Sequence, residues 1–576
     1  MSTAAPVPAG PTSVVEQLVP VPLADGTVLR ATVHRPVTDR PVPVVLALTP
    51  YPVGAARDEM DDQGLVDRGL AVVVVALRGT GASEGTFVPW DGHVEDARDV
   101  LEWCSSRPWA TGAVVGWGRS YLAQTLLYLA STGHPALRAM HLAVCPGDPV
   151  DVSYRGGALL VGSSLAWATA MTRGVLGRAA AAGEDVADEM AEWEALASDL
   201  PRAALSAPLA DLPLLARRFP AWRDWVTHPA GDAWWRERAL PPRPAVPTLF
   251  VAGWHDVFRD LTLREFATSR HPASRLVVGP WAHGAPWRAI GEVDHGRAAA
   301  RGAERLGAEA VDFLVAHATG AADDVAVPSV PSVPSVPSVP SLPPVRVFVM
   351  GSDEWRDLDA WPPPATASTW YLAPDGVLAA GPAAGTAEPS RFTFDPADPV
   401  PTVGGPNLLE QGDAALGAGP WDQRRLDARP DVLSFVSEPL AEDLTVIGDV
   451  VVHVVGATDA ADTDWTATLS DVHPDGAALG VLHGIARVRE VLGELVPPGE
   501  AREVPVDLGA TAHTFRAGHR LRVDVSSSSF PRFDVNPGTG TSAGVTPLGD
   551  FRVAHQTVHH DAAHPSRLVL PVVPPA

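Results

Sequence analysis

The sequence predicts an α/β domain with a mainly parallel sheet, which is interrupted by a helical insertion and followed by an all-β domain. Two continuous β-branched runs, PVPVVLALTPY and GLAVVVVALRG, lie near the N-terminus, as expected for strands buried on both faces of a parallel sheet. Residues 155–240 are rich in Ala, Leu and Trp with helical periodicity. Beyond residue 345, short apolar runs are separated by Gly, Pro and Asp turns, which is typical of a sandwich or jelly roll.

The elements of the α/β domain follow in order along the chain. Residues 13–48 contain alternating segments around Asp25-Gly26, a hairpin signal. The next segments alternate between helix and strand, and after the insertion the alternation resumes. Before the insertion, the predicted helices are RDEMDDQGLVDRG, EDARDVLEWCSS and the helix after Ser120, and they alternate with the strands GLAVVVVALRG, AVVGW and LRAMHLAVC. After the insertion, the strands PTLFVAGWHD and SRLVVGPWAHG alternate with the helices LTLREFATS and AERLGAEAVDFLVAHATG.

This pattern predicts four regions. We expect the α/β domain to comprise residues 1–145 and 241–325, the helical insertion residues 146–240, a linker residues 326–344 and the β domain residues 345–576. The linker contains VPSVPSVPSVPSVPS at 327–341, and Pro at every third position favours a solvated polyproline II segment. We interpret this repeat as slippage within a tolerant surface loop rather than as a signalling ligand.

Composition excludes several classes of function. The net charge of −25 disfavours nucleic acid and anionic membrane surfaces as partners, and no run of eighteen apolar residues is present. We see no secretory signal, so Cys104 and Cys145 read as reduced, buried thiols and the expected compartment is the cytoplasm. The chain has no HExxH and no paired CxxC spacing, so we expect no metal and no cofactor.

The chain contains no Lys, and all 43 of its basic residues are Arg. A GC-rich coding bias explains this composition, since Ile is also scarce. Whatever its cause, the absence of Lys excludes pyridoxal Schiff bases, phosphate-loop lysines and Ser–Lys dyads.

Ser120 is the candidate nucleophile. The hydrolase signature requires Gly two residues before and two residues after the Ser; Gly118 fits, but Leu122 does not, and Ser120 alone reads as a helix N-cap. A Ser nucleophile needs a base and an orienting carboxylate. Asp256 and His283 each follow a predicted strand, in the chain order Ser, acid, His that α/β-hydrolases use, at strand ends where open α/β sheets place their sites.

Two other motifs are weaker. In RGTGASEG the third Gly, Gly85, comes one residue too late after Gly79 and Gly81 for a dinucleotide fingerprint. The acidic residues Asp459, Asp462 and Asp464 lack the Gly and the terminal Glu of a calcium loop, so we interpret them as a turn.

GWGRSYLAQ resembles the G-x-S-Y-x-G elbow of the serine hydrolase superfamily that includes the cocaine esterases and the Xaa-Pro dipeptidyl-peptidases (S15). In this family Tyr follows the Ser, which explains the failed signature; the second Gly of the elbow is Ala123 here. Further matches span most of the chain: TPY at 49–51, RGTGASEG at 78–85, EDARDVLEW at 95–103, GWHD at 253–256, GPWAH at 279–283, VFVMGSDEWR at 347–356 and SSSSFPRFDVNPGTG at 526–540.

The resemblance implies an α/β-hydrolase fold with an inserted helical cap and a C-terminal β jelly roll. It implies that Ser120 is the nucleophile, His283 the general base and acid, and Asp256 the residue that orients His283. The oxyanion hole maps onto the Tyr51 hydroxyl and the backbone N–H of Tyr121.

The resemblance also implies pocket residues. Trp167, in GGALLVGSSLAW, is a candidate for the wall of the acyl pocket, although a buried core Trp is an equally good interpretation. Leu408 and Leu409, in GPNLLEQ, resemble residues of the β domain that approach the same pocket.

We therefore expect a carboxylic-ester hydrolase that forms an acyl-enzyme with a small-molecule ester. The alternatives are an Xaa-Pro dipeptidyl-peptidase, or another acyl or amide hydrolase such as an α-amino-acid ester hydrolase or β-lactam acylase. No acidic residue appears in SYLAQT to hold a substrate ammonium, which disfavours the amino-acid ester hydrolase. A non-catalytic binding module is the alternative from a different class, and the sequence leaves a homo-oligomer open.

Overall fold

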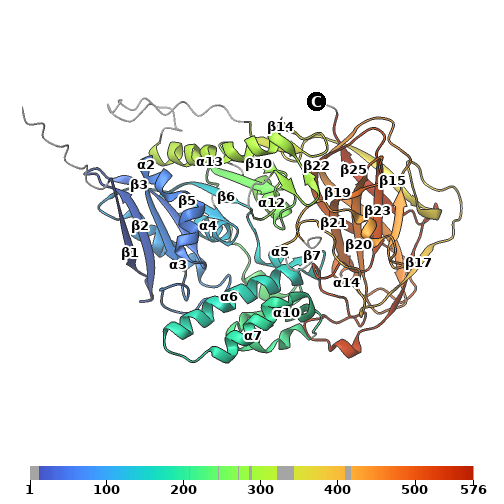
Figure 1. Ribbon diagram of the computed structural model, residues 1–576, viewed down its shortest axis with the longest axis horizontal. Helices are drawn as coiled ribbons and strands as arrows, with labels where there is room; N and C mark the ends of the chain where they lie inside the picture. The colour runs from blue at the N-terminus through green and yellow to red at the C-terminus, as the bar shows by residue number, and fades with distance from the viewer. Residues whose placement is uncertain are drawn as a thin grey trace, which may run out of the picture.

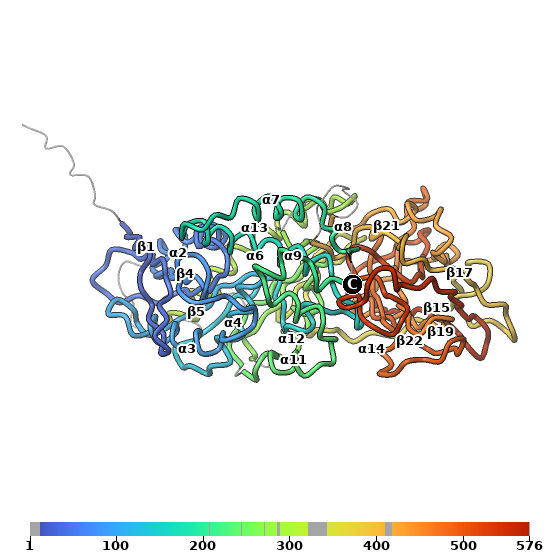
Figure 2. The backbone as a smooth tube through the Cα atoms, turned by 90° about the horizontal axis from the view of Figure 1, so that it is seen from below, coloured from blue at the N-terminus to red at the C-terminus, as the bar shows by residue number. Residues whose placement is uncertain are grey.

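The computed structural model describes residues 12–206, 208–243, 245–269, 271–284, 288–320, 343–408 and 417–574. An α/β part and a β-rich part lie toward opposite ends of the long axis of the molecule, and a helical segment lies beside the α/β part, below it in the view of Figure 1 (Figures 1 and 2). The Pro-Ser-Val repeat at 327–341 lies outside the described residues. Within the described ranges, no helix is long and apolar enough to cross a membrane.

A ten-stranded sheet forms the α/β part, in the order β1-β2-β4-β3-β5-β6-β9-β10-β13-β14. The predicted Asp25-Gly26 hairpin is confirmed, because β1 and β2 pair antiparallel on either side of it. From β4 to β13 all neighbours are parallel. The strands are β1 (Ser13–Pro22), β2 (Val28–Pro36), β3 (Val42–Thr49), β4 (Ala71–Ala76), β5 (Ala110–Arg119), β6 (Leu137–Ala143), β9 (Thr248–Gly253), β10 (Arg275–Gly279), β13 (Val345–Val349) and β14 (Glu354–Leu358).

Helices cover both faces of this sheet. Val45 and Val72 belong to an apolar cluster with α1, α2 and α13, whereas Val44 and Val73 belong to the opposite cluster with α3, α4 and α12. Because successive strand residues point to opposite faces, burial on both faces explains the continuous β-branched runs. The helices are α1 (Val53–Glu59), α2 (Asp62–Asp67), α3 (His93–Ser105), α4 (Tyr121–Ser131), α12 (Arg259–Thr268) and α13 (Gly296–Thr319).

The sheet pairing of one segment differs from the expected boundary. Residues 345–358, which we assigned to the β domain, form β13 and β14; β13 pairs with β10 and β14 with β13, so both strands complete the α/β sheet. The segment VRVFV is buried, and it packs equally well in either kind of sheet, so its composition could not place it. The α/β sheet therefore extends to Leu358.

The segment between β6 and β9 is mainly helical, as its periodicity predicts. It begins with a short hairpin, and its long helix α6 lies below the sheet in the view of Figure 1. Its elements are α5 (Pro149–Ser153), β7 (Tyr154–Arg155), β8 (Ala158–Leu159), α6 (Val161–Ala181), α7 (Ala187–Ser198), α8 (Leu200–Ala204), α9 (Pro213–Arg218), α10 (Ala221–Thr227) and α11 (Ala233–Glu237). A two-stranded ribbon, β11 (Ala289–Ile290) and β12 (Val293–Asp294), precedes α13.

An eleven-stranded, mostly antiparallel sheet forms the β-rich part. The longest pairing joins β19 to β22. The elements are β15 (Thr366–Ala373), β16 (Val377–Ala379), β17 (Ser390–Phe394), β18 (Leu433–Val436), β19 (Leu444–Thr458), β20 (Asp464–Val472), β21 (Ala478–Arg487), α14 (Val488–Leu492), β22 (Arg502–Phe515), β23 (Arg520–Ser526), β24 (Ala554–Val558) and β25 (Arg567–Val572).

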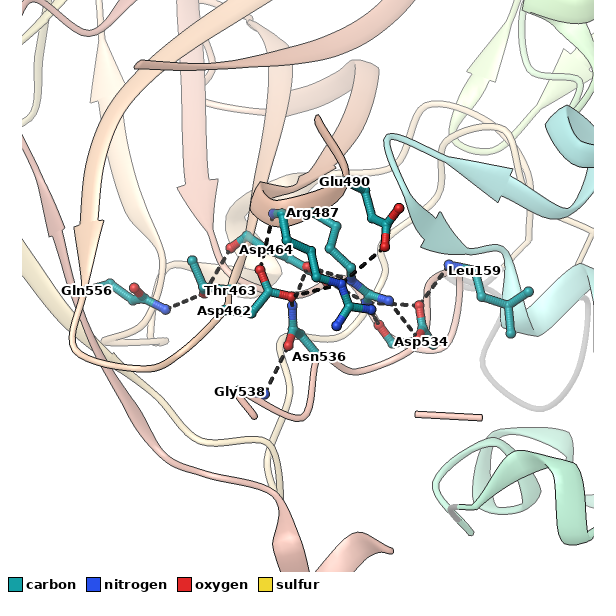
Figure 3. A network of polar contacts seen from close by, with 11 residues as sticks. Leu159, Asp462, Thr463, Asp464, Arg487, Glu490, Asp534, Asn536, Gly538 and Gln556 are labelled. Carbon is teal, nitrogen blue, oxygen red and sulfur yellow. Dashed lines mark hydrogen bonds and ion pairs between the residues drawn. The ribbon is translucent and has the colours of Figure 1, made fainter. Parts of the chain in front are cut away.

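A buried ion-pair network joins the β-rich part to the helical segment (Figure 3). The Arg487 guanidinium donates to both oxygens of Asp464 at 2.9 Å and to both oxygens of Asp534 at 3.0 Å. Asp534 also accepts the backbone N–H of Leu159 at 2.8 Å, and the N–H of Arg487 donates to the carbonyl of Gly156 at 2.7 Å. The start of the helical segment is thereby held by two residues of the β-rich part.

The acidic run Asp459, Asp462 and Asp464 is more than the predicted turn. Asp459 and Asp462 do lie between β19 and β20. However, Asp464 begins β20 and pairs with Arg487, and the side-chain amide of Asn536 donates to Asp462 at 3.1 Å and to Asp464 at 2.7 Å. Two of the three carboxylates therefore stabilise a buried network, which the sequence alone did not reveal.

Candidate active site

Ser120 lies at the junction between β5 and α4, with φ 56° and ψ −130°. Positive φ is costly for a residue with a Cβ, and such strain persists only where the surroundings hold it. Here the Ser120 N–H donates to the carbonyl of Ala143 on the neighbouring strand β6, at 3.0 Å. The Ser120 side chain makes no capping hydrogen bond to α4, so the N-cap interpretation does not account for this residue.

Close packing at this turn explains Gly118. A Cβ at Gly118 would lie 2.5 Å from the carbonyl oxygen of Leu122 and 2.6 Å from the nitrogen of Ala123. The strand thus approaches the first turn of α4 too closely for any side chain. Ala123, which replaces the second Gly of the family's elbow, is fully buried in the core, so the turn accommodates its methyl group.

The structure brings Ser120, His283 and Asp256 into one hydrogen-bonded chain. The Ser120 hydroxyl lies 2.9 Å from Nε2 of His283, and Nδ1 of His283 lies 2.6 Å from Oδ2 of Asp256. The carboxylate accepts the Nδ1 proton, so Nε2 carries the lone pair that can accept the proton of Ser120. These distances are within the reach that a nucleophile and its base require.

The loop after β9 fixes the carboxylate. Asp256 is 0% exposed, and its Oδ1 accepts the backbone N–H of Phe258 at 2.7 Å. The neighbouring cation Arg259 instead pairs with Asp260, at 2.7 Å. The second oxygen of Asp256 therefore remains directed at His283.

Tyr51 follows β3 and lies beside the nucleophile in the same cavity. Burial raises the pKa of Tyr51 to about 12, opposed by a hydrogen bond from Trp167, so its phenol stays protonated at neutral pH. The indole N–H of Trp167 donates to the Tyr51 oxygen at 2.9 Å. Because that bond occupies a lone pair, the hydroxyl proton of Tyr51 remains available to an oxygen in the cavity.

Tyr121 is the first residue of α4, and the first N–H groups of a helix have no carbonyl partner within it. Its side chain points elsewhere: the hydroxyl lies 2.8 Å from Nε2 of His93 and accepts the N–H of Trp90 at 3.3 Å. Burial lowers the pKa of His93 to about 4, so the neutral ring accepts the Tyr121 proton. The sequence gives no signal for His93 or Trp90, because both lie between the motifs RGTGASEG and EDARDVLEW.

The triad opens into a cavity of about 320 Å³. Trp167 lines it, as does Leu408, while Leu409 lies outside the described residues. Trp167 stacks on Tyr121, with ring centroids 5.4 Å apart. Mostly apolar residues complete the described lining: Trp90, Pro146, Val152, Ala166, Trp225 and Phe258, with Gln124, Ser163 and Ser164.

The described lining of this cavity contains no carboxylate. Three larger hollows among the described residues, of about 770, 750 and 460 Å³, are lined by neither Ser120 nor His283. The smaller cavity is therefore the one relevant to chemistry at Ser120.

Comparisons with known families agree with this architecture. Residues 25–285 match the model of the X-Pro dipeptidyl-peptidase (S15) family, and residues 337–569 match that of the X-Pro dipeptidyl-peptidase C-terminal non-catalytic domain. Among curated proteins, the chain is 36% identical to the cocaine esterase of Rhodococcus sp. (strain MB1 Bresler), over 96% of this chain and 97% of that protein.

Solved structures of similar shape cover the whole chain. An α-amino acid ester hydrolase matches with a TM-score of 0.76 and 25% identity, over 99% of this chain and 98% of that one. An aminopeptidase from a marine sediment Thaumarchaeota archaeon matches with a TM-score of 0.78 at 24% identity, over 100% and 99%. The latter likeness shows a shared fold.

Proposed function

Since the chain belongs to the S15 family of X-Pro dipeptidyl-peptidases and is a serine ester hydrolase of the α/β-hydrolase type, we propose that Ser120, His283 and Asp256 carry its reaction. The cocaine esterase described above is its relative in this family. The fold is an α/β hydrolase with a C-terminal non-catalytic domain made largely of β-sheet. The observation that supports the proposal most directly is the hydrogen-bonded chain from Asp256 through His283 to the strained Ser120.

In the first half of the reaction, the Ser120 oxygen attacks the ester carbonyl while Nε2 of His283 takes its proton. The Nδ1–H of His283 stays bonded to Asp256, which stabilises the imidazolium. The carbonyl oxygen becomes an oxyanion, which accepts hydrogen bonds from the Tyr51 hydroxyl and the Tyr121 N–H. The C–O bond to the alcohol then breaks, and Nε2 of His283 returns the proton to the leaving alkoxide.

In the second half, water attacks the acyl-Ser120 ester. Nε2 of His283 takes a proton from that water, and the same two donors hold the second oxyanion. Collapse of this intermediate breaks the bond to the Ser120 oxygen, which receives the proton from His283. The products are a carboxylic acid and an alcohol, and the enzyme returns to its starting state.

The cavity favours an uncharged, apolar acyl group. Indole and phenyl faces of Trp167, Trp225 and Phe258 form much of its wall, and a flat apolar group gains by contact with such faces. A volume of about 320 Å³ suits a small molecule rather than a folded polypeptide. We therefore propose small esters with short or aromatic acyl groups as substrates.

Xaa-Pro peptides and α-amino-acid esters are less suitable substrates. Both carry an ammonium group near the scissile bond, and a desolvated ammonium needs a carboxylate partner. The described lining of the cavity offers none.

The finer architecture is also proposed: residues 146–240 act as a cap over the strand ends, and the C-terminal part is a jelly roll.

The proposal is tested by labelling and by a substrate panel. A fluorophosphonate should modify one site per chain, and peptide mass mapping should locate it at Ser120. Absence of labelling in folded protein would favour a non-catalytic binding module. A panel of phenyl esters, α-amino-acid esters and Gly-Pro anilides, compared by kcat/KM, should rank the phenyl esters first. Faster cleavage of the anilides would make the chain a peptidase instead.

A further inference from the structure

Three imidazoles surround one buried carboxylate in the β-rich part, far along the chain from the triad. Asp471 lies near the end of β20, and its side chain is 3% exposed. Its Oδ1 lies 2.8 Å from Nδ1 of His519, and its Oδ2 lies 3.0 Å from Nε2 of His513. Nε2 of His473 is 3.9 Å from the same Oδ2.

Three of these groups converge as metal ligands do. One ligand atom each from Asp471, His473 and His519 lie within 4.8 Å of one another. In a tetrahedral zinc site with bonds of about 2.0–2.2 Å, neighbouring ligand atoms are roughly 3.3 Å apart. Nδ1 of His519 lies 2.8 Å from Oδ1 of Asp471, and Nε2 of His473 lies 3.9 Å from Oδ2, so the two imidazole contacts of the carboxylate bracket that value through its two oxygens.

We propose that Asp471, His473 and His519 bind one divalent transition-metal ion of the zinc class. Neutral imidazole and carboxylate are the ligands that zinc and its neighbours in the first transition row prefer. Two imidazoles and one carboxylate leave one position for water. His513 supports the carboxylate from outside, as the hydrogen-bonded partners of ligating carboxylates do.

Backbone hydrogen bonds hold the two partly exposed ligands, His473 and His519, in defined turns. The His473 N–H donates to the carbonyl of Ala477 at 2.8 Å, which closes the turn between β20 and β21. The His519 N–H donates to the carbonyl of Arg516 at 3.0 Å, and the His519 carbonyl accepts the N–H of Leu440 at 2.8 Å. A site with fixed ligand backbones loses little entropy when the ion binds.

The nearby arginines do not neutralise the carboxylate. Arg516 pairs with Asp443 at 2.7 Å, and Arg520 donates to the carbonyl of Ser437 at 2.8 Å. Among the described residues, the side-chain hydrogen bonds that Asp471 accepts come from imidazoles. A cation between His473 and His519, whose ring centroids are 4.5 Å apart, would compensate the charge of Asp471.

The place of this cluster predicts a structural role for the ion. His513 forms a bridge with Met350, which directly follows β13 of the α/β sheet. A Cβ at Gly351 would lie 2.2 Å from the carbonyl oxygen of Thr514, so the two parts are in close contact here. An ion at Asp471 would stiffen this junction without touching the catalytic cavity.

A second cluster, His559, Asp561 and His564, is a weaker candidate and serves as a control. Its three ligands come from one segment of six residues and none is buried. In the primary cluster, by contrast, the ligands come from two separate turns and enclose a buried carboxylate. The expectation of no metal rested on spacing motifs, which cannot detect a ligand such as His519 that lies 46 residues beyond His473.

The test uses full-length protein without a polyhistidine tag, treated with chelator and dialysed. Titration with Co²⁺ should give visible ligand-field bands that saturate at one ion per chain, and Zn²⁺ should abolish them by competition. His519→Gln and His473→Gln should each weaken Co²⁺ binding at least about 100-fold. His564→Gln should leave the affinity unchanged.

Zn²⁺ should raise the melting temperature of the wild type and of His564→Gln, but not that of His473→Gln. His473 is the most exposed ligand, so its variant should fold. The proposal is overturned if the wild type does not bind Co²⁺, if both primary variants bind as tightly as the wild type, or if only His564→Gln loses the ion. Labelling of Ser120 by fluorophosphonate in the metal-free protein reports the hydrolase proposal separately.

Discussion

Two sets of buried polar groups in this molecule make opposite use of their hydrogen-bonding capacity. In the network around Arg487, the guanidinium contacts four carboxylate oxygens and Asp534 also holds the backbone of Leu159. In the chain from Asp256 to Ser120, the groups form a single file that ends at the cavity. One set is saturated, while the other leaves the Ser120 oxygen facing an open space.

The difference separates stability from reactivity. Fully paired charges in a low-dielectric interior favour one arrangement and are costly to disturb. A serine with positive φ and no capping bond costs stability but exposes its oxygen to a substrate. The two sets are physically linked, because Asp534 holds the segment that leads into α6 and hence to Trp167.

The largest effect is expected at Ser120. Ser120→Ala removes the nucleophile and should lower kcat for a phenyl ester by about 10⁴–10⁶-fold, measured by initial rates. The melting temperature should stay the same, because His283 is the one partner of the hydroxyl among the described residues. Ser163→Ala, which removes another hydroxyl from the cavity wall, is the control and should retain activity. Equal losses in both variants would contradict the assignment.

The saturated network should respond in stability rather than in rate. Arg487→Met leaves Asp464 and Asp534 buried without a counter-charge, which should lower the free energy of unfolding by about 3–5 kcal/mol, measured by urea denaturation. Arg223→Met breaks an exposed pair with Asp211 and should change it by less than about 1 kcal/mol. Similar values for the two variants would show that burial does not distinguish these ion pairs.

The residues around the Ser120 cavity, by contrast, should affect the reaction rate rather than the stability of the fold. Tyr51→Phe removes a proposed oxyanion donor and should lower kcat by about 10²–10³-fold with little change in KM, measured by steady-state kinetics. Tyr154 is a matched control, because its hydroxyl bonds the carbonyls of Trp225 and His228. Tyr154→Phe should cost about 1 kcal/mol of stability and leave kcat within a few-fold. The reverse pattern would exclude Tyr51 from the reaction.

The smallest expected effect on kcat comes from removing the hydrogen bond by which Trp167 positions Tyr51. Trp167→Phe keeps an aromatic wall but removes the indole N–H that bonds the Tyr51 oxygen, and should lower kcat by roughly tenfold, the equivalent of one neutral hydrogen bond. Trp225 lines the same cavity, and its indole N–H has no partner among the described residues. Trp225→Phe should therefore leave kcat nearly unchanged while altering KM. A kcat loss in Trp225→Phe equal to that of Trp167→Phe would show that Trp167 does not position Tyr51.

Local patterns in the sequence were sufficient for part of this picture. Strand–helix alternation, which depends on neighbours in the chain, predicts that Ser120, Asp256 and His283 each follow a strand, here β5, β9 and β10, and that the β-branched runs are buried. The contacts that the sequence did not reveal act over long separations. The Trp167–Tyr51 bond spans 116 residues and the Asp534–Leu159 bond 375, and no periodicity records such contacts. The sheet that residues 345–358 join could not be predicted for the same reason, because only the pairing of β13 with β10 and of β14 with β13 identifies it.

The bond between Asp534 and Leu159 has a consequence for biosynthesis. At about 5–20 residues per second, a ribosome that has just made Leu159 needs on the order of 20–75 s to deliver the carboxylate that anchors it. During that interval Ser120 has already been synthesised, but the segment that leads into α6 and to the cavity residue Trp167 lacks the hydrogen bond from Leu159 to Asp534 that will hold it. Completion of the pocket thus waits until Asp534 has been synthesised.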